Sequence, residues 1–140
     1  MIGAIIIKNK VRAAFAALTR RDVSAFLSDW AEDAVFIYPS VVSAGGRIEG
    51  KEIIEKWFQN FLEHFPEVKM TPKHICVQNI FALSGTNVVA AELEVTGKNR
   101  EGKSFQNEGV TVITTEKGKG VLVRDYVFDA EMLKKAWGEG

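Results

Sequence analysis

Residues 120–128 read Gly-Val-Leu-Val-Arg-Asp-Tyr-Val-Phe, and this predicted strand is the most informative part of the sequence. Side chains of a strand alternate between its two faces, so Asp125 shares one face with the valines at 121, 123 and 127. The opposite face carries Leu122, Arg124, Tyr126 and Phe128. Neither face is uniformly polar, and we therefore expect this strand to lie in a sheet that is covered on both sides.

Three further stretches before this one have strand patterns, namely 73–83, 87–97 and 103–115. Glycine-containing turns separate the four strands at 84–86, 97–102 and 118–120. Short turns between sequential strands allow only antiparallel pairing. The second half of the chain is therefore predicted to form an antiparallel meander.

The first half has mainly helical patterns. Apolar residues recur at helical spacing over 4–19, and Asp22 is a good N-cap for a second, short helix that includes Trp30. A short strand follows at 34–38, and 43–46 is expected to be a loop. Gly50 precedes a third helix, whose apolar stripe consists of Ile53, Ile54, Trp57, Phe58, Phe61, Leu62 and Phe65; a last short helix is expected at about 130–137.

Helices grouped before a run of strands indicate an α+β domain. We expect a single domain over residues 1–140, built as a cone. In it a curved, mainly antiparallel sheet wraps about three N-terminal helices and leaves a deep central pocket. The chain of 140 residues is long enough for one sizeable core.

Composition narrows the classes of partner. Lys+Arg and Asp+Glu number 18 each, so no basic excess favours nucleic acid. The single cysteine, Cys76, allows no internal disulfide, and two distant histidines complete no zinc pattern.

The apolar start at 1–7 precedes its basic residues, whereas in a signal peptide the basic residues come first, and no apolar stretch is long enough to span a membrane. We expect a cytoplasmic protein without metal, cofactor, nucleic-acid or membrane partners.

Asp125 is the first candidate for chemistry. A carboxylate between apolar neighbours loses hydration, which raises its pKa and suits it to act as a general acid or base near neutral pH. The alternative is that Asp125 is exposed or paired with a lysine. Tyr38, at the end of the 34–38 strand, either donates a hydrogen bond into the pocket or only packs with a wet hydroxyl.

The strand at 87–97 allows two interpretations. Glu92, Glu94 and Thr96 share one face, and Leu93 and Val95 share the other. In the first interpretation the acidic face points to water and the aliphatic face to the core. In the second, both faces are covered and the acidic face is a cavity wall.

Four motifs, in this order and spacing, resemble the nuclear-transport-factor-2-like (NTF2-like) superfamily, specifically its SnoaL-like and ketosteroid-isomerase-like members. They are Phe26–Phe36 (FLSDWAEDAVF), Gly46–Ile54 (GRIEGKEII), Gly102–Phe105 (GKSF) and Arg124–Asp129 (RDYVFD). The resemblance covers nearly the whole chain and implies an α+β cone, a deep pocket and often a dimer through the sheet. Its members include isomerases, cyclases, epoxide hydrolases and pure binding modules, so the fold does not determine the function.

Two enzyme groups of the superfamily can be compared residue by residue. Limonene-epoxide hydrolases end in a similar Trp-Arg-Asp-Tyr-Phe-Asp run, which implies that Asp125 matches their catalytic aspartate. Their second aspartate then falls at Glu94 and their bridging arginine at Glu92, so the relay between two carboxylates is lost. In ketosteroid isomerases the proton-shuttling aspartate precedes a proline, and here Tyr38 precedes Pro39. Steroid isomerisation is therefore not expected.

These observations predict a small-molecule pocket protein that forms a homodimer through the outer face of the sheet, where Leu122, Tyr126 and Phe128 make an apolar row. As a cofactor-free acid/base enzyme of isomerase, cyclase or hydrolase type, it would act on a small, largely apolar substrate. Asp125 would carry the proton, Glu92 and Glu94 would tune it, and Tyr38 would donate a hydrogen bond. The alternative is a non-catalytic ligand-binding or partner-binding dimer. The expected cavity residues are Phe15, Leu18, Phe36, Phe61, Thr96, Asn107, Val123 and Val127.

Overall fold

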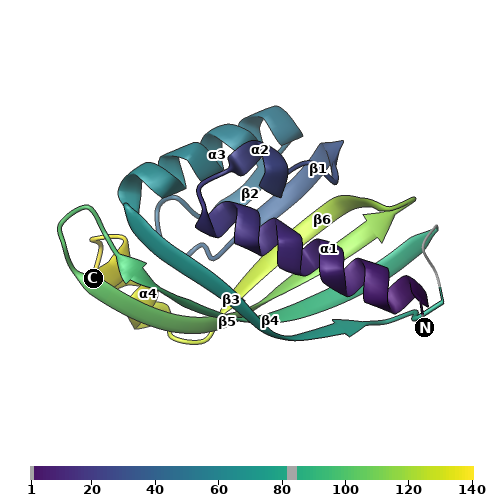
Figure 1. Ribbon diagram of the computed structural model, residues 1–140. Coiled ribbons are helices and arrows are strands. Elements are labelled where there is room, and N and C mark those ends of the chain that lie inside the picture. Colours follow the sequence, from purple (N-terminus) through teal and green to yellow (C-terminus); the bar gives the residue numbers. More distant parts are fainter. Residues whose placement is uncertain (1, 82–84) are drawn as a thin grey trace.

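The computed structural model describes residues 2–81 and 85–140 and confirms the α+β class (Figure 1). The helices are α1 (Ile2–Thr19), α2 (Val23–Phe26), α3 (Lys51–His64) and α4 (Ala130–Ala136). The strands are β1 (Trp30–Tyr38), β2 (Gly46–Glu49), β3 (Glu67–Val77), β4 (Thr86–Lys98), β5 (Ser104–Glu116) and β6 (Lys119–Val127).

All six strands form one sheet in the order β2-β1-β6-β5-β4-β3. The pairs β3–β4, β4–β5 and β5–β6 are antiparallel, so the predicted meander is confirmed. β1 joins it by pairing parallel to β6, and β2 pairs antiparallel to β1. The sheet is therefore mixed. β6, the strand that carries Asp125, lies near the middle of the sheet, between β1 and β5.

The sheet is strongly curved, and α1, α2 and α3 lie on one side of it (Figure 1). α1 contacts β3 and α3 contacts β1, while α4 contacts β5, with Asp129 at its N-terminus hydrogen-bonded to Asn107 near the start of that strand. The core between these layers is rich in aromatic rings. The Phe58 ring on α3 lies 4.9 Å from that of Phe26 and 5.0 Å from that of Phe36, centroid to centroid. These edge and tilted contacts anchor the helices on β1.

α1 is 18 residues long, and its buried side chains, including Val11, Phe15 and Leu18, face the sheet. Its other face carries exposed residues, among them Asn9 and Arg12. None of the helices within 2–81 and 85–140 is long and apolar enough to cross a membrane.

Two side chains fix the turn between α1 and α2. Asp22 accepts a hydrogen bond from the Ala25 amide at 3.0 Å, as expected of an N-cap. The Arg21 guanidinium donates to the carbonyl oxygens of Leu62, Phe65 (3.0 Å) and Pro66 (3.2 Å), where α3 ends. These bonds satisfy carbonyls that have no partner within the helix and tie α3 to the end of α1.

The structure corrects three predicted boundaries. Trp30 opens β1 and is not part of the second helix, which ends at Phe26. The stretch 43–46, expected to be a loop, ends at Gly46 in β2. The strand expected at 73–83 runs over 67–77 instead, although Pro72 interrupts its pattern and its register with β4 shifts there; residues 82 and 83 lie outside the described residues. Pro72 is tolerated because β3 is an edge strand.

Candidate active site

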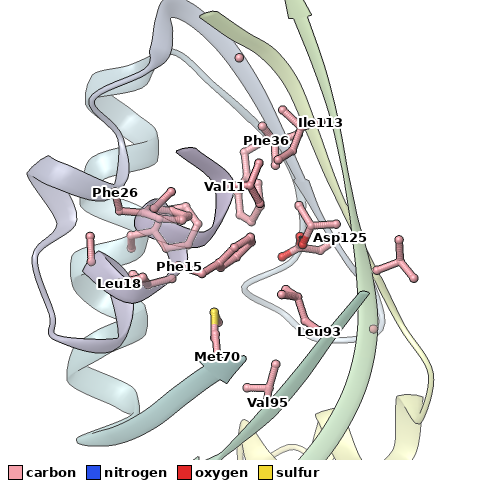
Figure 2. Close-up of a pocket in the computed structure, with 18 of the residues that line it drawn as sticks. Val11, Phe15, Leu18, Phe26, Phe36, Met70, Leu93, Val95, Ile113 and Asp125 are labelled. Carbon is pink, nitrogen blue, oxygen red and sulfur yellow. Dashed lines mark hydrogen bonds between the residues drawn. The ribbon is translucent and has the colours of Figure 1, made fainter. Parts of the chain in front are cut away.

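A cavity of about 370 Å³ lies between the helices and the concave face of the sheet (Figure 2). Helix α1 contributes Val11, Phe15 and Leu18 to its wall, and β4 contributes Leu93 and Val95. Rings from α2, β1 and α3 line it as well, among them Phe26, Trp30, Phe36, Phe58 and Phe61. The lining is mostly hydrocarbon, which suits a small apolar ligand.

Asp125 of β6 is the carboxylate that points into this cavity from the sheet (Figure 2). The alternation of β6 directs it inward together with Val123 and Val127, which also line the cavity. Thr111, its register partner on β5, donates a hydrogen bond from its hydroxyl to Asp125 Oδ1 at 2.7 Å. Burial raises the pKa of Asp125 from 3.8 to about 6, and the Thr111 hydrogen bond opposes this rise.

The other charged residues of the cavity lining are Lys10, Arg20, Asp29 and Glu108, but the Glu108 carboxylate faces outward, 4.0 Å from Lys73 Nζ. Lys10 Nζ lies 4.0 Å from the Asp29 carboxylate, and the Lys10 side chain is more than half exposed. Within the two described ranges, no lysine, arginine or histidine forms an ion pair with Asp125. Its ionised form therefore has no neutralising partner among these residues.

Tyr38 lies at the end of β1, buried in the same lining. Its hydroxyl oxygen accepts a hydrogen bond from the Trp137 indole N–H at 3.0 Å. Burial raises the pKa of Tyr38, the Trp137 hydrogen bond lowers it, and the negative charge of Asp125 raises it further. The phenol therefore stays neutral at physiological pH, with its own O–H available as a donor.

Helix α4 closes one end of the cavity with Met132, Leu133 and Ala136. Asn107 of β5 holds the start of this helix, because its amide group donates to the Asp129 carbonyl at 2.9 Å and its oxygen accepts from the Asp129 N–H at 3.1 Å. Asn107 lines the cavity as predicted. Its polar atoms, however, are engaged with α4.

The placement of Glu92, Glu94 and Thr96 in the cavity was wrong. Glu92 and Glu94 lie on the outer face of the sheet. The Glu92 carboxylate is hydrogen-bonded to His74 Nδ1 at 2.9 Å, and the Glu94 carboxylate lies 3.2 Å from Lys73 Nζ. Thr96 lines a separate surface pocket beside Thr19 and Arg21. The aliphatic face of β4 points inward because it buries more apolar area, and a shift of one position in a strand exchanges its faces.

The remaining predicted cavity residues, Phe15, Leu18, Phe36, Phe61, Val123 and Val127, all lie in the lining. Sequence reasoning missed Thr111 as the partner of Asp125, and Trp137 as the partner of Tyr38. Thr111 lies on an inward face of the 103–115 strand, but only the register of β5 against β6 pairs it with Asp125. No signal in the sequence connects residues 38 and 137.

The described residues contain no cluster of three or more His, Cys, Asp or Glu side chains that could hold a metal ion. Cys76 is exposed, although its position in the apolar run Ile75-Cys76-Val77 favours burial. Deep in the cavity, the Asp125 carboxyl group lies with the hydroxyl groups of Thr111 and Tyr38 among mostly hydrocarbon walls.

Comparison with known proteins places this geometry in a family. The chain is 26% identical over 130 residues to the uncharacterized protein YesE of Bacillus subtilis, covering 91% of this chain and 84% of YesE. Its fold is similar to that of Bal32a from a soil-derived mobile gene cassette, with a TM-score of 0.81, 18% identity and coverage of 96% and 98% of the two chains. It is also similar to an NTF2-like protein of unknown function from Burkholderia pseudomallei, with a TM-score of 0.76, 22% identity and coverage of 92% and 95%. The SnoaL-like domain family matches residues 11–123, and the chain belongs to this family.

Proposed function

We propose that the protein binds a small, largely apolar molecule in the cavity and that Asp125 exchanges a proton with it, as a cofactor-free acid/base enzyme. One observation carries this proposal, namely a carboxyl group with a pKa of about 6 in a cavity lined mostly by hydrocarbon. A group that titrates near the working pH is effective both as proton donor and as proton acceptor. The cavity volume of about 370 Å³ suits a ligand of one or two fused rings.

The roles follow from the hydrogen bonds. Thr111 occupies Asp125 Oδ1, which leaves the other carboxylate oxygen for the ligand. Tyr38 accepts from Trp137 and keeps its own O–H for an oxygen atom of the ligand. In this arrangement Asp125 removes a proton next to a carbonyl group, and Tyr38 donates a hydrogen bond to the oxygen that becomes negative.

Hydrogen–deuterium exchange of carbonyl probes tests this proposal without knowledge of the natural substrate. A panel of bicyclic ketones that contain an aromatic ring, led by 2-tetralone, is incubated with the protein in D₂O, and loss of the C–H signals beside the carbonyl is followed by NMR. We expect exchange faster than in buffer, and a loss of at least about tenfold in Asp125→Asn. Glu92→Gln is the matched control, because it removes a carboxylate from the outer face of the same sheet. An equal rate in Asp125→Asn and in the unmodified protein would refute the proposal.

The alternative is a non-catalytic ligand-binding module with the same cavity. It predicts binding of the ketones with no exchange above the buffer rate. The discriminating quantity is therefore the dependence of the exchange rate on Asp125, and not ligand binding by itself.

We also propose a homodimer through the outer face of the sheet. Tyr126 and Phe128 are 52% and 90% exposed on this face, an apolar area that a partner would bury. Arg124, between Leu122 and Tyr126, has a buried Nε atom without a hydrogen-bond partner among the described residues. A second copy would cover the apolar row and bring an acceptor group to the Arg124 Nε atom.

A further inference from the structure

The carboxylate of Asp125 is only partly satisfied by the protein. Its hydrogen bond from Thr111 reaches Oδ1, and no described residue donates to Oδ2. Among the described residues, only Arg124 Nε is an unpaired side-chain atom that is fully enclosed. Oδ2 is therefore accessible, and because Asp125 lines the cavity, we take this oxygen to face the cavity. An ionised carboxylate in such surroundings favours any cation that can reach it.

The described residues do not supply this cation. The basic lining residues are Lys10 of α1, which is 4.0 Å from Asp29, and Arg20 of the turn after α1, which is 3.9 Å from Asp22. The side chains of Lys10 and Arg20 are both more than half exposed. β1 contributes the neutral Tyr38. β5 contributes Glu108 to the lining, but its carboxylate faces outward, 4.0 Å from Lys73 Nζ and beside Glu94. The described lining residues of α3, α4 and β4 are uncharged.

Aromatic rings surround the same space. Phe15 reaches from α1 toward the strand that carries Asp125, and Phe36 lies above the carboxylate (Figure 2). Phe26 links them into one cluster through Phe58, with ring centroids 5.9 Å apart for Phe15–Phe26 and 5.0 Å apart for Phe36–Phe58. The faces of aromatic rings carry partial negative charge and attract organic cations.

From these three features we infer that the cavity also binds apolar amines as ammonium cations, with the nitrogen on the free oxygen of Asp125 and the hydrocarbon body among the aromatic rings. The inference rests on the proposed small-molecule cavity but goes beyond its chemistry, since proton exchange with a neutral molecule requires no charged ligand. An ammonium group held there would occupy the proton-transferring oxygen. Apolar amines are therefore ligands that block the proposed reaction.

A matched pair of probes isolates the contribution of the charge. 2-Aminotetralin and 2-tetralol share one bicyclic skeleton and differ in an ammonium group against a hydroxyl group. Their dissociation constants are measured by isothermal titration calorimetry at pH 7.5 and pH 5. We expect the amine to bind at least about tenfold more tightly than the alcohol at pH 7.5, because only the amine neutralises Asp125.

Lowering the pH should weaken the amine selectively. The pKa of Asp125 is about 6, so its ionised fraction falls about tenfold between pH 7.5 and pH 5, and the apparent affinity for the amine falls with it. The affinity for 2-tetralol should change much less. Asp125→Asn should bind the two probes about equally at both pH values, and Glu92→Gln should keep the preference for the amine.

Each outcome decides between the two proposals. Equal affinities for the two probes in the unmodified protein, or an amine preference that survives in Asp125→Asn, would overturn the amine inference. If Asp125-dependent exchange of 2-tetralone is then still observed, the proposed acid/base function stands alone. Failure of both tetralin probes and of the ketone panel to bind would overturn the cavity as a small-molecule site, and the amine inference with it.

Discussion

Replacing Asp125 by asparagine should change how the stability of the protein depends on pH. The substitution keeps the shape of the side chain and leaves it an acceptor for the Thr111 hydroxyl, but removes the ionisable group. In the unmodified protein the pKa of Asp125 rises from 3.8 in the unfolded chain to about 6 in the folded chain because of burial. Asparagine at this position has no such dependence.

The sign and magnitude follow from proton linkage. Well below pH 4 the carboxyl group is protonated in both the folded and the unfolded state, so it does not change the free energy of unfolding. As the pH rises toward 6, the unfolded state releases its proton first, so ionisation favours unfolding; above about 6 the loss levels off. A rise of about two pKa units corresponds to about 3 kcal/mol, with roughly half of the loss complete by pH 5. The stability of Asp125→Asn relative to the unmodified protein should therefore increase by about 2–3 kcal/mol from pH 4 to pH 7.

Urea unfolding followed by tryptophan fluorescence measures this difference at a series of pH values. Taking the difference between the two proteins cancels the contribution of the other carboxyl groups, including Glu139, whose pKa the Ser43 hydrogen bonds lower. Glu92→Gln serves as the control for removal of a carboxylate from the same sheet. Parallel stability curves for Asp125→Asn and the unmodified protein would refute the argument, since they would mean that Asp125 ionises as readily in the folded chain as in the unfolded one.

Three further predictions concern packing and assembly. Phe58→Ala should lower the free energy of unfolding by about 3–5 kcal/mol, because Phe58 is buried at the centre of the aromatic cluster; a urea-unfolding loss below about 1 kcal/mol would place it outside the core. Asn107→Ala should lower the free energy of unfolding by about 1–3 kcal/mol, because it removes two hydrogen bonds to Asp129, and should increase amide hydrogen exchange more in α4 than in α1; an equal increase across the chain would contradict this role. Light scattering should give twice the mass of one chain at micromolar concentration, and Tyr126→Asp should reduce it; a monomeric mass for the unmodified protein would exclude the homodimer.

Much of the fold can be predicted because its sequence periods are strong. The three long strands after residue 86 alternate over nine or more residues, and the described boundaries differ from the predicted ones by about one residue. β3 is different, since Pro72 and exposed polar residues of an edge strand hide its start. β2 is only four residues long, too short for a period to be seen. Trp30 fits a helical stripe and a strand equally well, and its pairing with β6 decides between them.

The candidate site was predictable only as far as one strand determines it. Asp125 among valines identifies the inward face of β6 from local alternation alone. The orientation of Glu92 and Glu94 depends on the register of β4 against its neighbours, which is a property of the whole sheet. The resemblance to epoxide hydrolases favoured the acidic face, and the plain alternation of polar and aliphatic residues favoured the aliphatic one. Burial of Leu93 inside the cone agrees with the alternation.

Carboxylates on the outer face of the sheet have basic partners, whereas Asp125 on the inner face has none among the described residues, and this contrast supports a functional role for Asp125. On the outer face, Lys73 lies 3.2 Å from Glu94 and His74 lies 2.9 Å from Glu92, so each acid has a basic neighbour on β3. On the inner face, Asp125 receives one hydroxyl group and no cation from the described residues, at a cost of about 3 kcal/mol at neutral pH. A threonine or valine at the same position would fit the inward row without that cost. A carboxyl group with this cost that also lines the cavity is best explained by what it does to a ligand, and the amine and deuterium-exchange measurements both address that role.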